Sequence, residues 1–335
     1  MAPSILRTLV VSTLLVTVSD GRLRSQADTR LLHALKERVD YATLDQQAVE
    51  TIARLARSRW PRELSGFDYL RVEHFSAGGA SHWMSTWLHR ETGLEFVLLP
   101  GGRFQMGSPP SEADRRDDEL QHWVTLDPFL VARTECTWGA WNEVGGAAGT
   151  SRRGQAESDR HPVSGIGPAD VEVWCRAARL TFPTEAQWEY LCRGGTTTAW
   201  AMGSNKADLA RFANLGSAEC PESWKAVPGI TEDWHDGHGD GTAPVGSFGH
   251  NAFGLFDVHG NLSEWCRDQY FSYEVKPEKG TGLRAGVSGE QQARGGNFGG
   301  GAAAARSAKR LTCGDGRSPG GNHGFGFRPS LDLPW

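Results

Sequence analysis

The segment FDVHGNLSEW, residues 256–265, places two carboxylates on either side of a Gly-Asn turn. Asp257 and Glu264 can supply side-chain oxygens, and the backbone near Gly260 and Leu262 can supply carbonyl oxygens. Hard cations such as Ca²⁺ prefer oxygen ligands of these two kinds from a tightly folded loop. A purely structural turn has the same composition, and from the spacing alone it is the favoured interpretation.

A second polar segment, DWHDGHGDG at residues 233–241, holds two His and three Asp. These residue types can bind a transition metal. The segment also resembles the start of an EF-hand loop, but the twelfth position counted from Asp236 is Ser247 rather than Glu. The EF-hand interpretation therefore fails, and a solvated polar loop is the alternative to a metal site.

Cysteine chemistry has little support from spacing. The six cysteines are Cys136, Cys175, Cys192, Cys220, Cys266 and Cys313, and no two form a CxxC pair. Zinc clusters and thioredoxin-like chemistry are thus disfavoured. Up to three disulfides in an exported protein and buried free thiols both remain open. A phosphate-binding P-loop is absent.

The N-terminus resembles a signal peptide over residues 1–20. Arg7 precedes the apolar run TLVVSTLLVTV, residues 8–18, which is followed by small and polar residues. The run is too short to span a bilayer as a helix. We expect a secreted or periplasmic protein on this basis; a buried N-terminal strand in a cytoplasmic protein is the alternative.

Local patterns predict the elements that position these residues. Residues 28–60 are predicted to be helical, with Thr43 and Gln46 as a capping box, and residues 61–90 form a junction. The remaining predictions are a strand, turn and strand over 95–108, a solvated charged loop at 111–119, strand-like alternation over 122–137, and helices at 137–144, 168–178 and 184–193. Thr184 and Gln187 form the capping box of the last helix.

Composition indicates a folded protein with many turns. The 335 residues include 42 Gly and 13 Trp, which favours irregular segments held by aromatic anchors. The formal net charge of −5 gives no basic excess that would indicate a nucleic-acid partner.

Six segments occur in a characteristic order: FVLLPGGRFQMGS (96–108), HPVSGI (161–166), FPTEAQWEYLCRGGT (182–196), TAPVGSFGHNAFGLFDVHGNLSEWCRD (242–268), ARGGN (293–297) and GFGFRP (324–329). Together they resemble the formylglycine-generating enzyme family, also called the sulfatase-modifying factor domain. The resemblance implies an irregular α+β domain over residues 91–332, related to C-type lectins and low in regular secondary structure. A short helical segment and junction, residues 21–90, would precede it.

The resemblance also implies two calcium sites, and with it calcium becomes the favoured interpretation of the 256–265 turn. The first candidate site consists of Asp257, Gly260, Leu262 and Glu264. The second candidate site takes side-chain oxygens from Asn214 and Asp236 and carbonyl oxygens from Leu215 and His238.

Active members of the family resemble copper-dependent oxidases that convert a sulfatase cysteine to formylglycine. Two of their cysteines after an Arg-Gly-Gly turn bind the metal, because soft thiolates select Cu(I). In this sequence those places fall at Gly300 and Ala305, and no Cys occurs between Cys266 and Cys313. Copper is therefore not expected, and no catalytic residue is assigned. A related branch resembles iron-dependent sulfoxide synthases, but residues 1–90 contain no HxxxH pattern.

These observations favour a non-catalytic member whose calcium-braced scaffold presents C-terminal loops to an unidentified protein or small molecule. A more specific form is a variable protein of a diversity-generating retroelement, because the last forty residues mix Gly, Ala, Asn, Ser and Arg before GFRP. The alternative is an oxidoreductase that modifies protein cysteines or thiols through other ligands. We expect a monomer with no stable membrane span.

Overall fold

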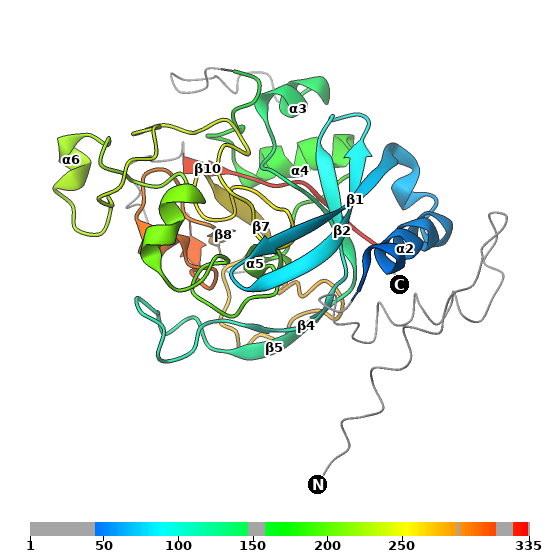
Figure 1. The fold of residues 1–335 in the computed structure, drawn as a ribbon, viewed down its shortest axis with the longest axis horizontal. Coiled ribbons are helices and arrows are strands. Elements are labelled where there is room, and N and C mark those ends of the chain that lie inside the picture. Colours follow the sequence, from blue (N-terminus) through cyan, green and yellow to red (C-terminus); the bar gives the residue numbers. More distant parts are fainter. Residues whose placement is uncertain (1–43, 147–157, 287–288, 313–323, 334–335) are drawn as a thin grey trace, which may run out of the picture.

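The structure is a computed structural model that describes residues 44–146, 158–286, 289–312 and 324–333 (Figure 1). Its helices are α2 (Gln46–Arg59), α3 (Trp138–Glu143), α4 (Pro168–Ala177), α5 (Glu185–Arg193) and α6 (Glu222–Lys225), with 3-10 turns η2 (Glu63–Gly66), η3 (Lys206–Arg211) and η4 (Ala302–Ala305). Its strands are β1 (Phe67–Ala77), β2 (Ala80–His89), β3 (Glu95–Leu99), β4 (Gly102–Met106), β5 (His122–Leu126), β6 (Phe129–Ala132), β7 (Ser263–Gln269), β8 (Gln291–Arg294), β9 (Leu311–Thr312), β10 (Phe325–Gly326) and β11 (Ser330–Asp332). Short elements joined by long irregular segments give the α+β, C-type-lectin-related architecture.

The largest sheet has the strand order β1-β2-β3-β6-β11, and each neighbouring pair is antiparallel. Its first two strands form a long hairpin with Gly78 and Gly79 at the turn, at φ 59° and 82°. Two consecutive positive φ values suit the twist of a two-residue hairpin. The hairpin occupies most of the region expected to be a junction. Because β2 pairs with β3, the sheet continues across the boundary predicted at residue 91.

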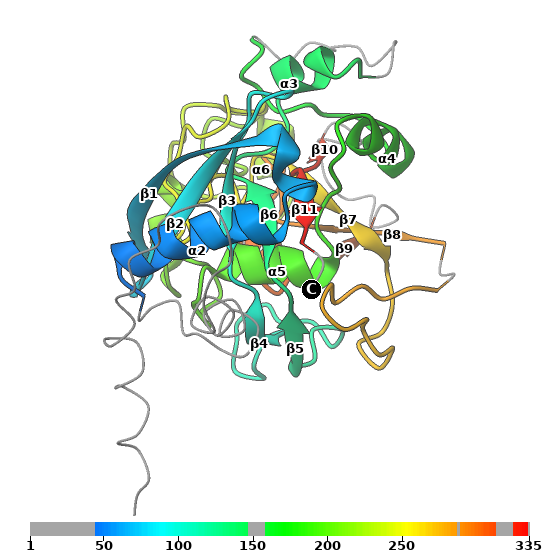
Figure 2. The ribbon, with the colours of Figure 1, turned by 90° about the vertical axis from the view of Figure 1, so that its right-hand side faces the viewer.

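Helix α2 packs against the β1–β2 hairpin (Figure 2). It confirms the predicted helix over Gln46–Arg59, whereas residues 28–43 and the proposed signal peptide lie outside the described residues. The Thr43 capping box is wrong, because the N-cap is Asp45 and its side chain accepts from the backbone N–H of Ala48 at 2.8 Å. The buried face carries Val49, Ile52 and Ala56.

The other two sheets are smaller. Strands β4 and β5 form an antiparallel pair, and β10-β7-β8-β9 form a four-stranded sheet in which β10 and β7 are parallel. The predicted strand, turn and strand over 95–108 are confirmed, yet β3 and β4 enter different sheets. The turn at Pro100-Gly101 thus redirects the chain instead of closing a hairpin.

Helix α5 is buried along its whole length. Its predicted capping box is confirmed: Thr184 Oγ1 accepts from the N–H of Gln187 at 3.1 Å, and Gln187 Oε1 accepts from the N–H of Thr184 at 2.9 Å. Gly194 ends the helix in the left-handed conformation at φ 55°. The burial also carries Glu185 and Glu189 into the interior, where each carboxylate requires a partner.

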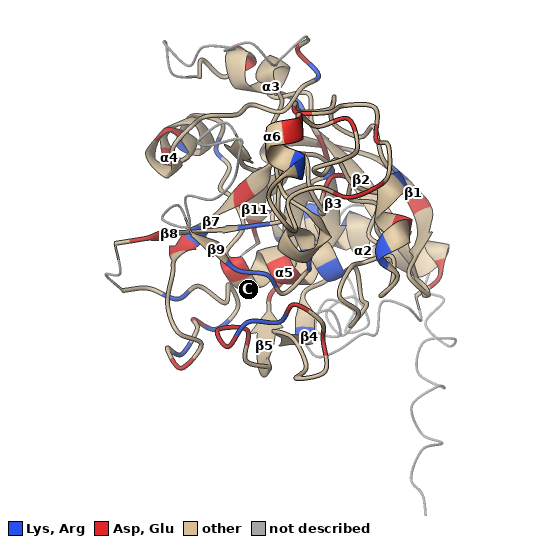
Figure 3. Cartoon of the chain, turned by 90° about the vertical axis from the view of Figure 1, so that its left-hand side faces the viewer, with Lys and Arg blue, Asp and Glu red and all other residues tan. Residues whose placement is uncertain are grey.

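Aromatic side chains fill much of the core, including Trp141 and Trp174, whose rings stack at 5.9 Å. Figure 3 shows acidic and basic residues interspersed along the chain. Among the described residues, no helix is long and apolar enough to cross a membrane. The five described cysteines are buried free thiols, and Cys313 lies outside the described ranges.

Candidate functional site

The first candidate site forms a tight turn directly before β7. Asp257 and Asn261 adopt positive φ values of 57° and 62°, and Gly260 has a φ of 112°. A Cβ at Gly260 would lie 2.3 Å from the carbonyl oxygen of Asn214. Only glycine can lie this close to the Asn214 carbonyl. The close contact places the first candidate site directly against Asn214, which belongs to the second candidate site.

Asp257 contributes one unpaired oxygen to the first candidate site. Its Oδ2 accepts from the backbone N–H of Gly246 at 2.7 Å, whereas its Oδ1 is buried and has no hydrogen-bond partner in the described structure. Burial raises the pKa of this carboxyl to about 6. A buried oxygen without a donor is unfavourable unless a proton or a cation satisfies it.

Glu264 has protein partners on both of its oxygens. Arg328 donates to Oε1 from Nη2 at 2.7 Å and to Oε2 from Nε at 3.2 Å. Trp188 donates to Oε2 from its indole N–H at 2.8 Å. Both Glu264 and Arg328 are fully buried. The negative charge of Glu264 is therefore balanced by Arg328 without a metal.

Glu135 is a third buried carboxylate here, and sequence reasoning missed it. Its Oε1 accepts from the N–H of Leu262 at 2.8 Å, and its Oε2 accepts from the side-chain amide of Asn261 at 2.6 Å. Burial raises its pKa well above the usual range, and the carboxylates of Asp257 and Glu264 raise it further. The available signal was a Glu placed shortly after an apolar strand.

In the second candidate site, two side-chain oxygens lack partners. Asn214 donates from Nδ2 to the carbonyl of Gly241 and to Oδ1 of Asn261, both at 3.0 Å, and its own Oδ1 is buried without a donor among the described residues. Asp236 Oδ1 accepts from the N–H of His238 at 3.0 Å, and its Oδ2 is likewise buried and unpaired.

The structure also brings Leu215 and His238 to this site. Burial raises the pKa of Asp236, and the hydrogen bond from the backbone N–H of His238 opposes that rise. The His238 ring packs edge-on against Phe248 at 5.7 Å, and its carbonyl accepts from the N–H of Gly241 at 3.2 Å. His238 is thus placed to act through its backbone and not through its imidazole.

The donor chemistry of the second candidate site fits a hard cation. Among the described residues, two buried side-chain oxygens lack a hydrogen-bond donor, one on an amide and one on a carboxylate, and both are ligand types that calcium prefers. The first candidate site offers one such oxygen. In the part of the chain that the structure describes, no three His, Cys, Asp or Glu side chains form a metal-binding group. The fold therefore gives no support to a transition-metal site at residues 233–241.

Residues 295–305, called the Gly/Ala loop below, are held in the interior. The carbonyl of Gly300 accepts from the N–H of Gly216 at 2.9 Å, and the carbonyl of Ala305 accepts from Nδ1 of His259 at 2.7 Å. Ala305 is fully buried. A Cβ at Gly301 would lie 2.5 Å from the carbonyl oxygen of Gly229. The position of the Gly/Ala loop is therefore fixed by contacts of its backbone with the surrounding chain.

Buried ion pairs hold the two ends of the Gly/Ala loop to α5. Arg294 donates to Glu185 at 2.9 Å and to Glu189 at 3.1 Å, and Arg310 donates to Glu185 at 2.7 Å. Burial opposes ionisation of Glu185, but Arg294 and Arg310 outweigh it and lower its pKa. Without these pairs, the carboxylates that α5 carries into the interior would be buried without partners.

The charged segment 111–119 is not wholly the solvated loop that the sequence predicts. Glu119 is fully buried, and Arg306 donates to both of its oxygens at 2.8 Å. Arg306 also donates to Glu112 at 2.6 Å. The prediction is wrong for these two glutamates, because their partner comes from the other end of the domain.

Two buried cysteines, Cys192 and Cys266, are held as thiols, and Cys192 lies beside His259, whose ring contacts the Gly/Ala loop. Cys192 Sγ lies 3.7 Å from Nε2 and 3.8 Å from Nδ1 of His259, so it packs against the face of that ring. Burial raises the pKa of Cys192 to about 12 and that of Cys266 well above its usual value. Neither supplies a ready thiolate for Cu(I).

The sulfatase-modifying factor enzyme 1-like domain model matches residues 86–329. The formylglycine-generating enzyme of Thermomonospora curvata is 28% identical over 229 residues, covering 53% of this chain and 73% of that protein. A Bos taurus protein named inactive C-alpha-formylglycine-generating enzyme 2 is 28% identical over 237 residues, covering 55% of this chain and 74% of that one. The structure of PvdO from Pseudomonas aeruginosa aligns with a TM-score of 0.60 at 26% identity, covering 74% of this chain and 98% of that chain. The chain belongs to the sulfatase-modifying factor enzyme 1-like domain family.

Proposed function

We propose that this chain does not make formylglycine and serves as a binding member of the family, on a scaffold braced by calcium. The observation that carries the proposal is the Gly/Ala loop. Where the family resemblance implies two copper-binding thiolates, this chain has Gly300 and Ala305. Neither residue has a side chain that can ligate a metal or transfer an electron.

The surroundings of the loop support the same conclusion. Its carbonyls at Gly300 and Ala305 accept hydrogen bonds from the N–H of Gly216 and from the ring of His259. The nearby Cys192 is kept protonated by burial, so ionising it for Cu(I) would require a large free energy. The available residues do not fit a copper site, and we derive no reaction through copper.

Calcium has a fitting donor set. At the second candidate site, Asn214 and Asp236 would hold the ion together with the carbonyls of Leu215 and His238. At the first candidate site, the unpaired oxygen of Asp257 would be the main side-chain ligand. Calcium would supply positive charge to buried oxygens that lack donors. Asn261 accepts from Asn214 and donates to Glu135, so it links the two candidate sites. Such bracing would fix the loops that precede the Gly/Ala loop for ligand recognition.

Competition titration with a Cu(I) chelator tests the absence of a copper site. The purified protein is expected to leave the chelator's copper in place, whereas a formylglycine-generating enzyme assayed in parallel removes it. Tight binding of one copper with thiolate absorption would favour the oxidoreductase alternative. Loss of that binding in Cys192→Ser or Cys266→Ser would identify the ligand.

A further inference from the structure

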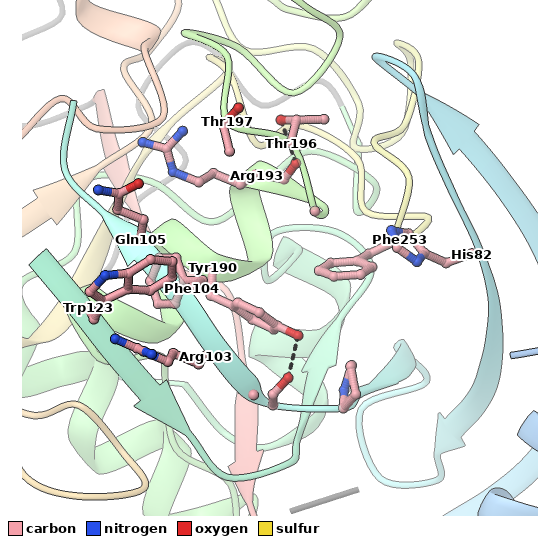
Figure 4. A pocket seen from close by; sticks show the side chains of 14 residues that line it. His82, Arg103, Phe104, Gln105, Trp123, Tyr190, Arg193, Thr196, Thr197 and Phe253 are labelled. Carbon is pink, nitrogen blue, oxygen red and sulfur yellow. Dashed lines mark hydrogen bonds between the residues drawn. The ribbon is translucent and has the colours of Figure 1, made fainter. Parts of the chain in front are cut away.

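A cavity of about 510 Å³ lies apart from the Gly/Ala loop and from both candidate calcium sites (Figure 4). One wall comes from β4, another from α5 and the residues that follow it, and a third from β2 and the segment around Phe253. This volume is in the range of small-molecule sites. No residue used in the proposed function lines it.

A continuous row of four rings lines the inner part of this cavity. Phe104 lies 5.3 Å from Tyr190, Tyr190 lies 5.6 Å from Phe253, and Phe253 lies 4.9 Å from His82, as ring centroids. The Tyr190 hydroxyl donates to the carbonyl of Gly101 at 2.6 Å. Because that hydroxyl is occupied, Tyr190 offers its ring to a ligand, and the row of tilted rings favours an apolar body that can contact their edges and faces.

The charged residues that line the cavity are arginines, and no Asp or Glu lines it. Arg193 is balanced by Glu189, to which it donates at 2.8 Å and 2.9 Å. Arg103 differs, because its guanidinium lies 4.2 Å from the ring centroid of Trp123 at the rim. Trp123 is 56% exposed, so this cation–aromatic pair faces solvent. The rim therefore carries positive charge that a carboxylate can reach.

We propose that this cavity binds a small aromatic carboxylate, whose apolar body packs against the ring row while its anionic group pairs with Arg103. The inference is independent of the proposed function, since it uses neither calcium nor the Gly/Ala loop. The rim supplies further polar groups from Gln105 and Thr197, which can orient the ligand.

Three probes of one shape test the role of charge: 2-naphthoate, neutral 2-naphthalenemethanol and cationic 2-naphthylmethylamine. Each is titrated into the full chain by calorimetry. Naphthoate is expected to bind up to about fivefold more tightly than the neutral probe, since a solvent-exposed ion pair contributes up to about 1 kcal/mol. Undetectable naphthoate binding at millimolar concentration, or equal affinity for the three probes, would overturn the proposal.

Variants separate the anion contact from the ring row. Arg103→Gln is expected to remove the preference for naphthoate and leave the neutral probe unchanged. The exposed Arg57 on α2 provides a matched control, because Arg57→Gln makes the same change in net charge away from the cavity. Phe104→Ala should weaken both probes, with melting curves confirming that each variant folds. An equal loss in Arg103→Gln and Arg57→Gln would contradict a direct contact.

Discussion

Arg306 and Glu119 form a bidentate ion pair in the interior, with both contacts at 2.8 Å. The side chain of Arg306 is 1% exposed and that of Glu119 is fully buried. The pair joins the end of the Gly/Ala loop to the charged segment 111–119. It therefore fixes the C-terminal end of the Gly/Ala loop against that segment.

Breaking this pair is expected to destabilise the protein strongly. Arg306→Met leaves the buried carboxylate of Glu119 without its charged partner, which typically costs about 3–5 kcal/mol. Unfolding in urea measures the loss. Arg116→Met is the control, because Arg116 is 48% exposed and lies 3.5 Å from Asp118, and surface pairs contribute about 0–1 kcal/mol. Equal effects of Arg306→Met and Arg116→Met would contradict the assignment.

Steric closure of the Gly/Ala loop predicts different outcomes at adjacent glycines. Gly301→Ala would place a methyl group 2.5 Å from the carbonyl oxygen of Gly229, whereas at Gly300 the nearest atom is the Cβ of Ala304, at 3.4 Å. Gly301→Ala is expected to cost about 1–3 kcal/mol through overpacking, and Gly300→Ala much less. Thermal and urea unfolding compare them. If Gly301→Ala unfolds with the same free energy as the wild type, there is room for a methyl group at this position and the steric prediction is wrong.

His259 predicts a loss of stability in mild acid. Burial lowers its pKa to about 4 from 6.5, and its two ring nitrogens are occupied by the carbonyl of Ala305 and the N–H of Ala201. The unfolded chain binds this proton first, so the contribution of neutral His259 is complete above pH 6.5 and is lost as pH falls toward 4. The shift corresponds to about 3 kcal/mol.

The matched variant for this pH effect is His259→Gln, which can donate to Ala305 and accept from Ala201. Its unfolding free energy should fall less than that of the wild type between pH 6.5 and 4. Asp268, whose pKa is raised to about 6, increases the unfolding free energy as pH falls through this window. Both proteins contain Asp268, so its contribution cancels when the two pH profiles are compared. Parallel pH profiles for the two proteins would contradict the assignment.

Calcium removal is expected to lower the melting temperature, because an ion bound only to the folded state stabilises it by mass action. Asp236→Asn should abolish most of the calcium-dependent shift at the second candidate site. Asp233→Asn, at an exposed position in the same loop, should retain it. Elemental analysis of the purified protein gives an independent check. An unchanged melting curve under chelation, with no calcium found, would contradict the calcium proposal.

Local features of the fold were predictable, and distant partners were not. The α5 capping box follows from Thr184 and Gln187, which lie three residues apart. The pairs of Arg306 with Glu119 and of Glu264 with Arg328 span 187 and 64 residues. No local pattern indicates such pairs, so segment 111–119 was assigned to solvent and the Arg328 contact to Glu264 was missed.

The candidate metal residues show the same division. Turn chemistry identified Asp257 and Glu264, but only the family resemblance joined Asn214 to Asp236 across some twenty residues. Glu135 was missed because its role depends on contacts with Asn261 and Leu262, far along the chain. The β1–β2 hairpin was missed as well, since much of β1 is only partly buried and its apolar pattern is weak.

The mass of a sulfatase-type CxPxR peptide after incubation with the protein, copper and oxygen tests the central claim most directly. The account predicts no conversion of the cysteine to formylglycine, while a formylglycine-generating enzyme in the same buffer converts it. Copper- and oxygen-dependent conversion that persists across enzyme preparations and disappears on heat denaturation would contradict it.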